Sequence, residues 1–388
     1  MNCAKITIKI LAAVILMAAA GRPSFAEQWF LNGKIGSSPY VINQYDPDGL
    51  PHSDAPVAMP PSGSTNVAWP SALIPFGGSK IFLYASTYGA LWNAVHLWTA
   101  TSVDGPFIDQ GSVFSADPVL EPYGIGPAQV TYEPTSILQP FIMYYLVRGA
   151  SGPGQTIAVA TSVDGVHWTR GGPVLSTSLP QEAGGLSASY ACKTASGDYA
   201  LFYHGYSSDL SAGYGLVATS NSATGPFSNK AVILAPQSFL TTLTSYAGSV
   251  TARVPSGVSV PIGIPLLAGY STSGQEPVVA VRQSGTLVWF SRPFLYPHSS
   301  DQTISMLSAK VDPSYAQEQA DGTWKGTATA YGPAPGVAAE YTTGVAGSSL
   351  SGPWTFAANG IAFTPFTSYG LNSTENPTPL VSDNKCSN

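Results

Sequence analysis

Short runs rich in Val, Ile, Tyr, Phe and Thr alternate along the chain with turns rich in Gly, Pro, Ser and Asp, and long windows show no helical period of apolar residues. Such runs, bounded by turn residues, are typical of β-strands. They recur in pairs: residues 71–74 with 80–84, 128–132 with 141–145, and 186–190 with 199–203. The pattern predicts an all-β protein.

A longer segment follows these pairs and repeats along the chain. The copies span residues 96–107, 157–168, 215–227, 277–289 (a weaker copy) and 341–354. Each copy predicts a strand, a tight turn and an aromatic residue that opens a second strand. Four strands per repeat and five repeats over residues 66–363, about 60 residues each, predict a five-bladed β-propeller with four-stranded antiparallel blades. The alternative is a β-sandwich or two smaller β domains.

The N-terminal segment has the pattern of a secretory signal peptide. Lys5 and Lys9 precede an apolar run over residues 10–20, and Ser24-Phe25-Ala26 is typical of a cleavage site. We therefore expect a signal peptide over residues 1–26 and a single propeller domain over residues 27–388, secreted or periplasmic. No later segment is long and apolar enough to span a membrane. The alternative is an N-terminal anchor helix.

Charged residues are scarce, at 9% of the chain against about 25% in typical domains. The 15 basic and 21 acidic residues form no basic run, which argues against nucleic-acid binding. After signal cleavage, Cys192 and Cys386 remain. They can pair in an oxidising compartment, or stay as two separate thiols. No Cys-x-x-Cys sequence supports a zinc or redox site.

The segment Ala-Thr-Ser-Val-Asp-Gly-Val-His-Trp, residues 160–168, and its Gly-Pro-Phe and Gly-Pro-Trp variants resemble the outer-strand turn of five-bladed glycosidase propellers. These are the arabinanase and β-xylosidase family, in the family 43 superfamily, and related fructan-acting enzymes. The sialidase Asp box is less similar. We interpret Asp104 and Asp164 as structural, because Asp bonds its own backbone in turns and the following Gly supplies a positive φ.

The resemblance implies catalytic carboxylates on the first strands of the first three blades. Blade one departs from the family pattern, with Trp69-Pro70-Ser71 where the family has Asp-Pro-Ser. Glycoside hydrolysis needs two carboxylates, one of them protonated. The hypothesis is that Glu182 is the general acid, that Asp54 or Asp301 is the base, and that Glu121 modulates them. The alternative is that these acids cap strands or lie solvated on the rim.

Aromatic residues near the predicted inner-strand starts are candidate sugar-binding residues: Trp69, Tyr123, Tyr246 and Tyr296. Each of them can instead pack between blades. His298, near Asp301, is a further candidate and could hold a water associated with a channel calcium. Otherwise we expect no metal and no cofactor.

These observations predict two main functions and one further class. The first is an exported glycoside hydrolase acting on an oligo- or polysaccharide in the central channel. The alternative is a non-catalytic glycan-binding or scaffolding propeller that has lost the catalytic acids. Lyases and sialidase-like hydrolases form a third, smaller class.

Overall fold

The computed structural model describes most of the chain after the N-terminal segment. The described residues are 28–34, 39–46, 51–53, 55–75, 77–89, 92–136, 138–150, 152–236, 240–262, 265–269, 276–290, 293–299, 303–306, 310–331, 340–356, 375–383 and 385–386. The predicted signal peptide, residues 1–26, lies outside them. No helix in the described part of the chain is long and apolar enough to cross a membrane.

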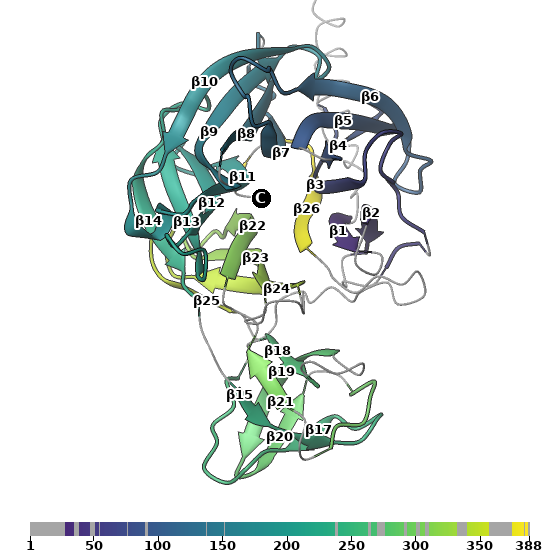
Figure 1. Ribbon diagram of the computed structural model, residues 1–388, viewed down its shortest axis with the longest axis vertical. Coiled ribbons are helices and arrows are strands. Elements are labelled where there is room, and N and C mark those ends of the chain that lie inside the picture. The colour runs from purple at the N-terminus through teal and green to yellow at the C-terminus, as the bar shows by residue number, and fades with distance from the viewer. Residues whose placement is uncertain are drawn as a thin grey trace, which may run out of the picture.

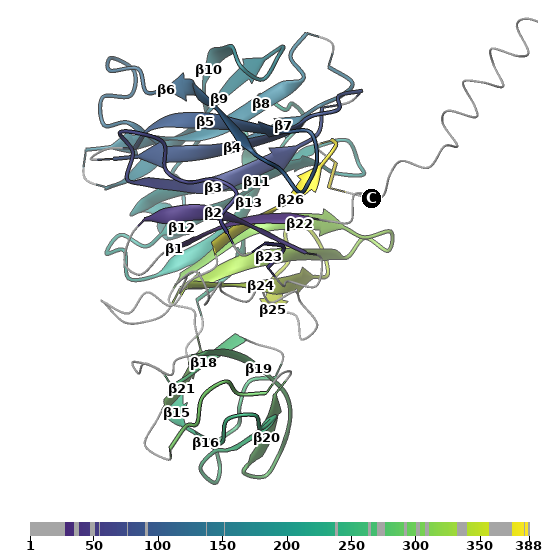
Figure 2. The same ribbon diagram turned by 90° about the vertical axis from the view of Figure 1, so that its right-hand side faces the viewer.

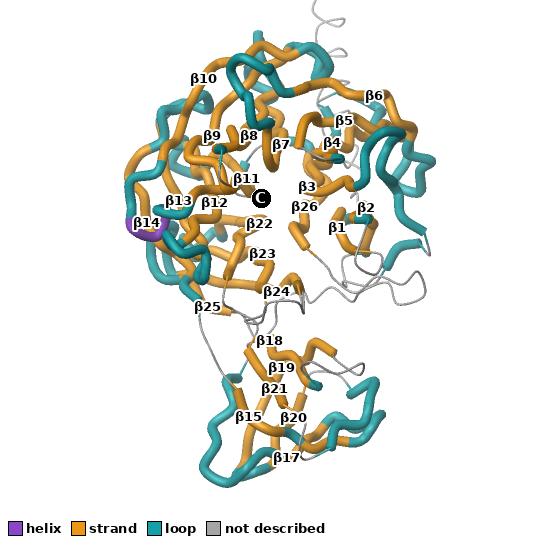
Figure 3. Tube along the Cα trace, viewed as in Figure 1, coloured by secondary structure: helices purple, strands orange, loops and turns teal. Residues whose placement is uncertain are grey.

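Within the described residues, strands make up nearly all of the regular structure (Figure 3), and the one short helix is the 3-10 turn η1 (Pro180–Glu182). The all-β prediction is therefore confirmed for the described residues. Four antiparallel units have four strands each. They are β3 (Asn66–Leu73), β4 (Ile81–Tyr88), β5 (Trp92–Ala100) and β6 (Ile108–Ser115); β7 (Ile125–Tyr132), β8 (Phe141–Gly149), β9 (Gly152–Ser162) and β10 (Trp168–Ser176); β11 (Gly185–Lys193), β12 (Tyr199–Tyr206), β13 (Gly213–Ser220) and β14 (Ser228–Leu234); and β22 (Lys310–Glu318), β23 (Trp324–Tyr331), β24 (Glu340–Gly347) and β25 (Trp354–Phe356).

A further set of strands joins the two ends of the chain. The strand β26 (Glu375–Val381) pairs antiparallel with β1 (Trp29–Lys34), which pairs with β2 (Tyr40–Tyr45). On its other side β26 runs parallel to β3. Figure 1 shows the five sets arranged around a common centre, with β3, β7, β11, β22 and β26 nearest to it. Local sequence patterns do not predict this joining of the two chain ends, because it depends on contacts between residues far apart in the sequence.

Residues 240–306 form a separate sheet. Its seven strands are β15 (Leu240–Thr242), β16 (Thr244–Ser245), β17 (Thr251–Arg253), β18 (Pro265–Ala268), β19 (Glu276–Ser284), β20 (Leu287–Phe290) and β21 (Thr303–Met306). Figures 1 and 2 both show this small β unit to one side of the other strands. The weak fourth copy, residues 277–289, therefore lies in this inserted unit and not among the sets around the centre.

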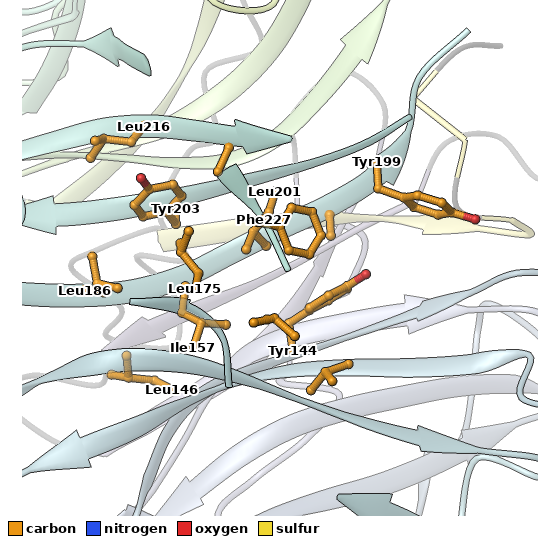
Figure 4. Packing of buried hydrophobic residues seen from close by; sticks show 14 of the residues in the cluster. Tyr144, Leu146, Ile157, Leu175, Leu186, Tyr199, Leu201, Tyr203, Leu216 and Phe227 are labelled. Atoms are coloured by element: carbon orange, nitrogen blue, oxygen red, sulfur yellow. The ribbon is translucent and has the colours of Figure 1, made fainter. Parts of the chain in front are cut away.

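Apolar residues fill the spaces between neighbouring units. Between β7–β10 and β11–β14, the buried side chains come from both units and interdigitate (Figure 4). Leu186, Leu201 and Leu216 of β11–β14 are fully buried there, as is Ile157 on the facing strand β9. Because each unit buries both faces against its neighbours, strands such as β7 and β12 are buried at nearly every position and show no simple alternation. The outermost strand β10 instead alternates between partly buried and exposed positions over its first half.

The repeated turn has the predicted structural hydrogen bonds in the copy at residues 160–168. The Asp164 carboxylate accepts hydrogen bonds from the backbone N–H groups of Val166 and His167, both at 2.8 Å. Gly165 has a φ of 76°, a conformation that glycine adopts without strain. Gly105 in the preceding copy also has a φ of 76°. Asp164 is therefore occupied in holding its turn, whereas the Asp104 carboxylate is 76% exposed and lies 3.0 Å from Nε2 of His52.

A disulfide joins Cys192 on the inner strand β11 to Cys386 near the C-terminus, across 194 residues of sequence. This resolves the open choice about the two cysteines in favour of pairing. Cys386 also forms backbone hydrogen bonds to two units. Its N–H donates to the carbonyl of Lys193 at the end of β11, and its carbonyl accepts from the N–H of Glu318 at the end of β22, each at 2.8 Å.

Candidate functional site

The innermost strands share one irregularity. The ladder shifts register between Ala68 and Ser71 in β3, between Ile125 and Ala128 in β7, between Ala188 and Tyr190 in β11, and between Pro313 and Tyr315 in β22. Three of these places hold a proline, namely Pro70, Pro127 and Pro313. Proline has no N–H to donate to a ladder, so a bulge is where a strand tolerates it. A bulge changes the direction in which nearby side chains point. Residues at these bulges are therefore the positions on the inner strands to search for functional side chains.

An aspartate stands at this place on β22. Asp312 precedes Pro313 and Ser314, and its side chain is 3% exposed. One of its carboxylate oxygens lies 3.9 Å from Nδ1 of His204, whose side chain is 1% exposed. The pair therefore joins the inner strand β22 of one unit to the second strand, β12, of the neighbouring unit.

His204 is held in place by its own unit. It lies on β12, paired with Ser187 on one side and Gly215 on the other. Its ring packs 4.2 Å from the ring of Tyr206, centre to centre. Burial and stacking fix the imidazole, so that Asp312 faces a group that can accept or share a proton.

Glu182, the predicted general acid, is fully buried in a saturated network. Lys230 Nζ lies 2.9 Å from both of its carboxylate oxygens. The hydroxyl of Tyr203 donates to it at 2.6 Å, and the N–H groups of Ser178 and Leu179 donate at 2.6 and 2.8 Å. Burial alone would raise the pKa of Glu182, but these hydrogen bonds outweigh it and lower the pKa below its usual value. A general acid needs a raised pKa, so these surroundings do not fit the predicted role.

Glu121 has the corresponding surroundings one unit earlier. Arg170 binds it with Nε and Nη2, each 3.0 Å from a carboxylate oxygen. Tyr145 donates to it at 3.0 Å and the Asp117 N–H at 2.5 Å. Glu121 and Glu182 therefore anchor the connections that precede β7 and β11. The alternative role for these two acids is to cap strands or to lie solvated on the rim. Both side chains do lie next to the start of a strand, but they are buried and ion-paired and not solvated.

The other predicted acids cannot be placed. Asp54 and Asp301 lie outside the described residues. Their predicted roles stay hypotheses.

The predicted aromatic residues separate into two groups. Trp69 lies in the bulge of β3 with a φ of 54°, partly exposed, and Tyr123 is 49% exposed shortly before β7. Both therefore stand near innermost strands, as predicted. Tyr246 and Tyr296, 78% and 40% exposed, belong to the inserted small β unit and are not at inner-strand starts.

His298 also belongs to the small β unit. It is buried, with Nε2 3.1 Å from the carboxylate of Glu276. A buried histidine in that unit does not fit the predicted channel contact. Within the described part of the chain, no three His, Cys, Asp or Glu side chains gather in a group that could hold a metal ion.

Sequence reasoning missed Asp312 and His204, although a signal was present. The Asp-Pro-Ser sequence that was sought in the first repeat occurs at residues 312–314. Counting residues 277–289 as a fourth blade hides this match, because those residues belong to the small β unit and not to the sets around the centre.

No model of a known protein family matches the chain, and no curated protein matches its sequence. Solved structures to which it is similar include an arabinanase from Bacillus subtilis, at 12% identity over 76% of this chain and 78% of that chain, with a TM-score of 0.41. An endo-arabinase from Bacteroides thetaiotaomicron has 10% identity over 76% and 80%, with a TM-score of 0.44. An endo-1,4-beta-xylanase from the same organism has 13% identity over 86% and 91%, with a TM-score of 0.43.

Proposed function

We propose that the protein is an exported five-bladed β-propeller that hydrolyses glycosidic bonds of an oligo- or polysaccharide. Four blades are the four-stranded units, and β26, β1 and β2 form the fifth. In this arrangement the C-terminal strand β26 closes the ring beside β3, which leaves few open sheet edges. The signal-like segment over residues 1–26 supports export to the periplasm or medium.

The observation that carries the catalytic part is the Asp312 carboxylate, buried on an innermost strand, 3.9 Å from Nδ1 of His204. In this proposal Asp312 is one of the two carboxylates that glycoside hydrolysis requires. His204 is a positioning residue that sets the charge and direction of Asp312. The mechanism does not use Glu121 or Glu182.

The second carboxylate must lie about 5–9.5 Å from the first. Glu375 is a candidate, because it begins β26, an inner strand that contacts β22. Asp54, a base candidate from the sequence, is the other candidate, whereas Asp301 is set aside because the segments before and after it belong to the small β unit. In this proposal one carboxylate of the pair is the general acid that protonates the leaving oxygen, and the other activates water or attacks the sugar.

The test measures new reducing ends released by the mature protein from arabinans, xylans, fructans and galactans. We expect release from one of them, and an Asp312→Asn variant should lose about 10²–10⁴-fold in kcat, the range associated with a lost acid or base. The matched control is Asp321→Asn, an exposed aspartate in the turn between β22 and β23. Full activity in a folded Asp312→Asn variant would exclude Asp312 as a catalytic residue.

The alternative is a glycan-binding propeller without hydrolysis, in which no pair of carboxylates acts on the bound sugar. The same panel distinguishes the two functions. Binding of a glycan by the folded protein without any release of reducing ends would favour the binding function.

A further inference from the structure

The small β unit has one buried face and one outer face. On β17 and β20, Ala252 and Val288 point inward and are 2% and 0% exposed. Their neighbours along the strands must therefore point outward, because side chains alternate across a strand. The outward set comprises Thr244, Thr251, Arg253, Arg282, Ser284, Leu287 and Trp289.

Strand register arranges these residues in two rows across the sheet. In one row Arg282 lies opposite Trp289, and Trp289 opposite Thr251. In the other row, Ser284 lies opposite Leu287, and Leu287 opposite Arg253. Tyr246 extends the first row, because it follows the buried Ser245 in β16 and is 78% exposed. Trp289 and Tyr246 stand two strands apart, roughly 10 Å.

The arginine in the first row is held in place. The Arg282 guanidinium carbon lies 3.9 Å from the centre of the Trp289 ring. Contact with the ring restricts the guanidinium, whose N–H groups, directed in the guanidinium plane, can bind a partner beside the ring. A planar guanidinium binds a carboxylate with two parallel hydrogen bonds, and a preorganised side chain loses less entropy when it binds.

The charge of this unit differs from that of the whole chain. Residues 240–306 carry three arginines, at 253, 282 and 292, and two acids, Glu276 and Asp301, whereas the full chain has a net charge of −6. Glu276 is buried and accepts hydrogen bonds from the Leu295 and Tyr296 N–H groups, at 2.9 and 3.0 Å. None of the outward residues named above is acidic, so Arg253 and Arg282 give the face a positive potential.

We propose that this outer face binds an anionic polysaccharide through its uronate residues. Arg282 and Arg253 would bind the carboxylates, while Tyr246 and the exposed part of Trp289 would pack against the apolar C–H faces of the sugar rings. Thr251 and Ser284 supply hydroxyls to the sugar. An aromatic row flanked by cations fits a sugar acid better than an acidic peptide, which has no rigid apolar ring face to stack. The proposal is independent of hydrolysis in the propeller.

The test is titration calorimetry of the full mature protein with tetragalacturonate, with methyl-esterified tetragalacturonate as the neutral counterpart. We expect binding of the acid form, weakened by salt, and little binding of the ester. The variants Arg282→Gln and Arg253→Gln should each weaken binding by about tenfold or more, as loss of a charge-assisted contact does. Val281→Ala is the control, since its side chain is exposed next to Arg282 at the bulge of β19 but carries neither a charge nor a hydrogen-bonding group.

Three results would overturn the proposal. These are no binding of tetragalacturonate by the folded protein, equal binding by the arginine variants, or equally tight binding of poly-glutamate. Because Trp289→Ala could disturb the sheet, Tyr246→Ala serves as the aromatic variant, and it should weaken binding without changing the thermal midpoint. Release of reducing ends by the propeller should be the same in all of these variants, so the failure of either proposal can be told from failure of the other.

Discussion

The Glu182 carboxylate and the Lys230 ammonium group form an ion pair that recurs as Glu121 and Arg170 in the preceding unit. In both cases the glutamate precedes an inner strand. The positively charged residue lies on the outermost strand of the same unit, 48 or 49 residues later. In both, a tyrosine from the second strand donates to the same carboxylate. The recurrence shows that these carboxylates belong to the architecture of the repeat.

Glu182→Gln should destabilise the fold by about 3–5 kcal/mol at neutral pH, because it leaves the Lys230 ammonium without its buried counter-charge. The pKa of Glu182 is lowered in the folded state from its usual 4.5. Its stabilisation is therefore complete above about pH 5 and is lost as the pH falls through the lowered folded pKa. Denaturant unfolding of both proteins at several pH values should show a difference that narrows in acid.

The control for this prediction is Asp198→Asn, an exposed carboxylate in the turn between β11 and β12. It should change the free energy of unfolding by less than about 0.5 kcal/mol. If Glu182→Gln were as stable as the parent but lost turnover on an identified glycan, the structural role assigned to Glu182 would be incorrect and a catalytic one restored.

Gly165→Ala should destabilise the fold through two separate effects. The residue has a φ of 76°, and an added Cβ would lie 2.4 Å from the Tyr84 hydroxyl oxygen. That hydroxyl also donates to the Gly165 carbonyl at 2.9 Å, so the contact joins neighbouring units. We expect a loss of about 2–4 kcal/mol from backbone strain and overpacking together.

Gly172→Ala separates the two effects. Gly172 has a φ of 92°, but an added Cβ would meet nothing within 4 Å. It should cost only the backbone contribution, about 1–2 kcal/mol. Equal losses in the two variants, measured by denaturant unfolding, would show that the Tyr84 contact adds nothing.

The strands of the first three units could be predicted because each is a short apolar run bounded by turn residues. The inserted unit could not be separated from them, since residues 277–289 also form a strand, a turn and a second strand with a Trp. A hairpin has the same local pattern in any sheet. The pairing of Trp29 with Pro379 depends on tertiary contacts between the two chain ends, which local patterns do not report.

The candidate site was harder to predict for a related reason. Glu121 and Glu182 were selected correctly as acids beside inner strands, but their partners Arg170 and Lys230 lie on strands far along the chain. Whether an acid is ion-paired decides its role, and that depends on packing between strands. Asp312 could have been found from its Asp-Pro-Ser sequence, once the inserted unit is removed from the repeat count.

Cys386→Ser should lower the free energy of unfolding by about 4–5 kcal/mol, because the bridge to Cys192 closes a loop of 194 residues and so restricts the unfolded chain. The tail also lies between two units, bonded to Lys193 in β11 and to Glu318 in β22, so its release removes contacts on both. Reduction of the parent protein should produce the same loss in denaturant unfolding, whereas a Cys192→Ser/Cys386→Ser variant should not respond to reductant. A parent protein whose stability is unchanged by complete reduction would show that the backbone hydrogen bonds of the tail are sufficient to hold the fifth set of strands in place.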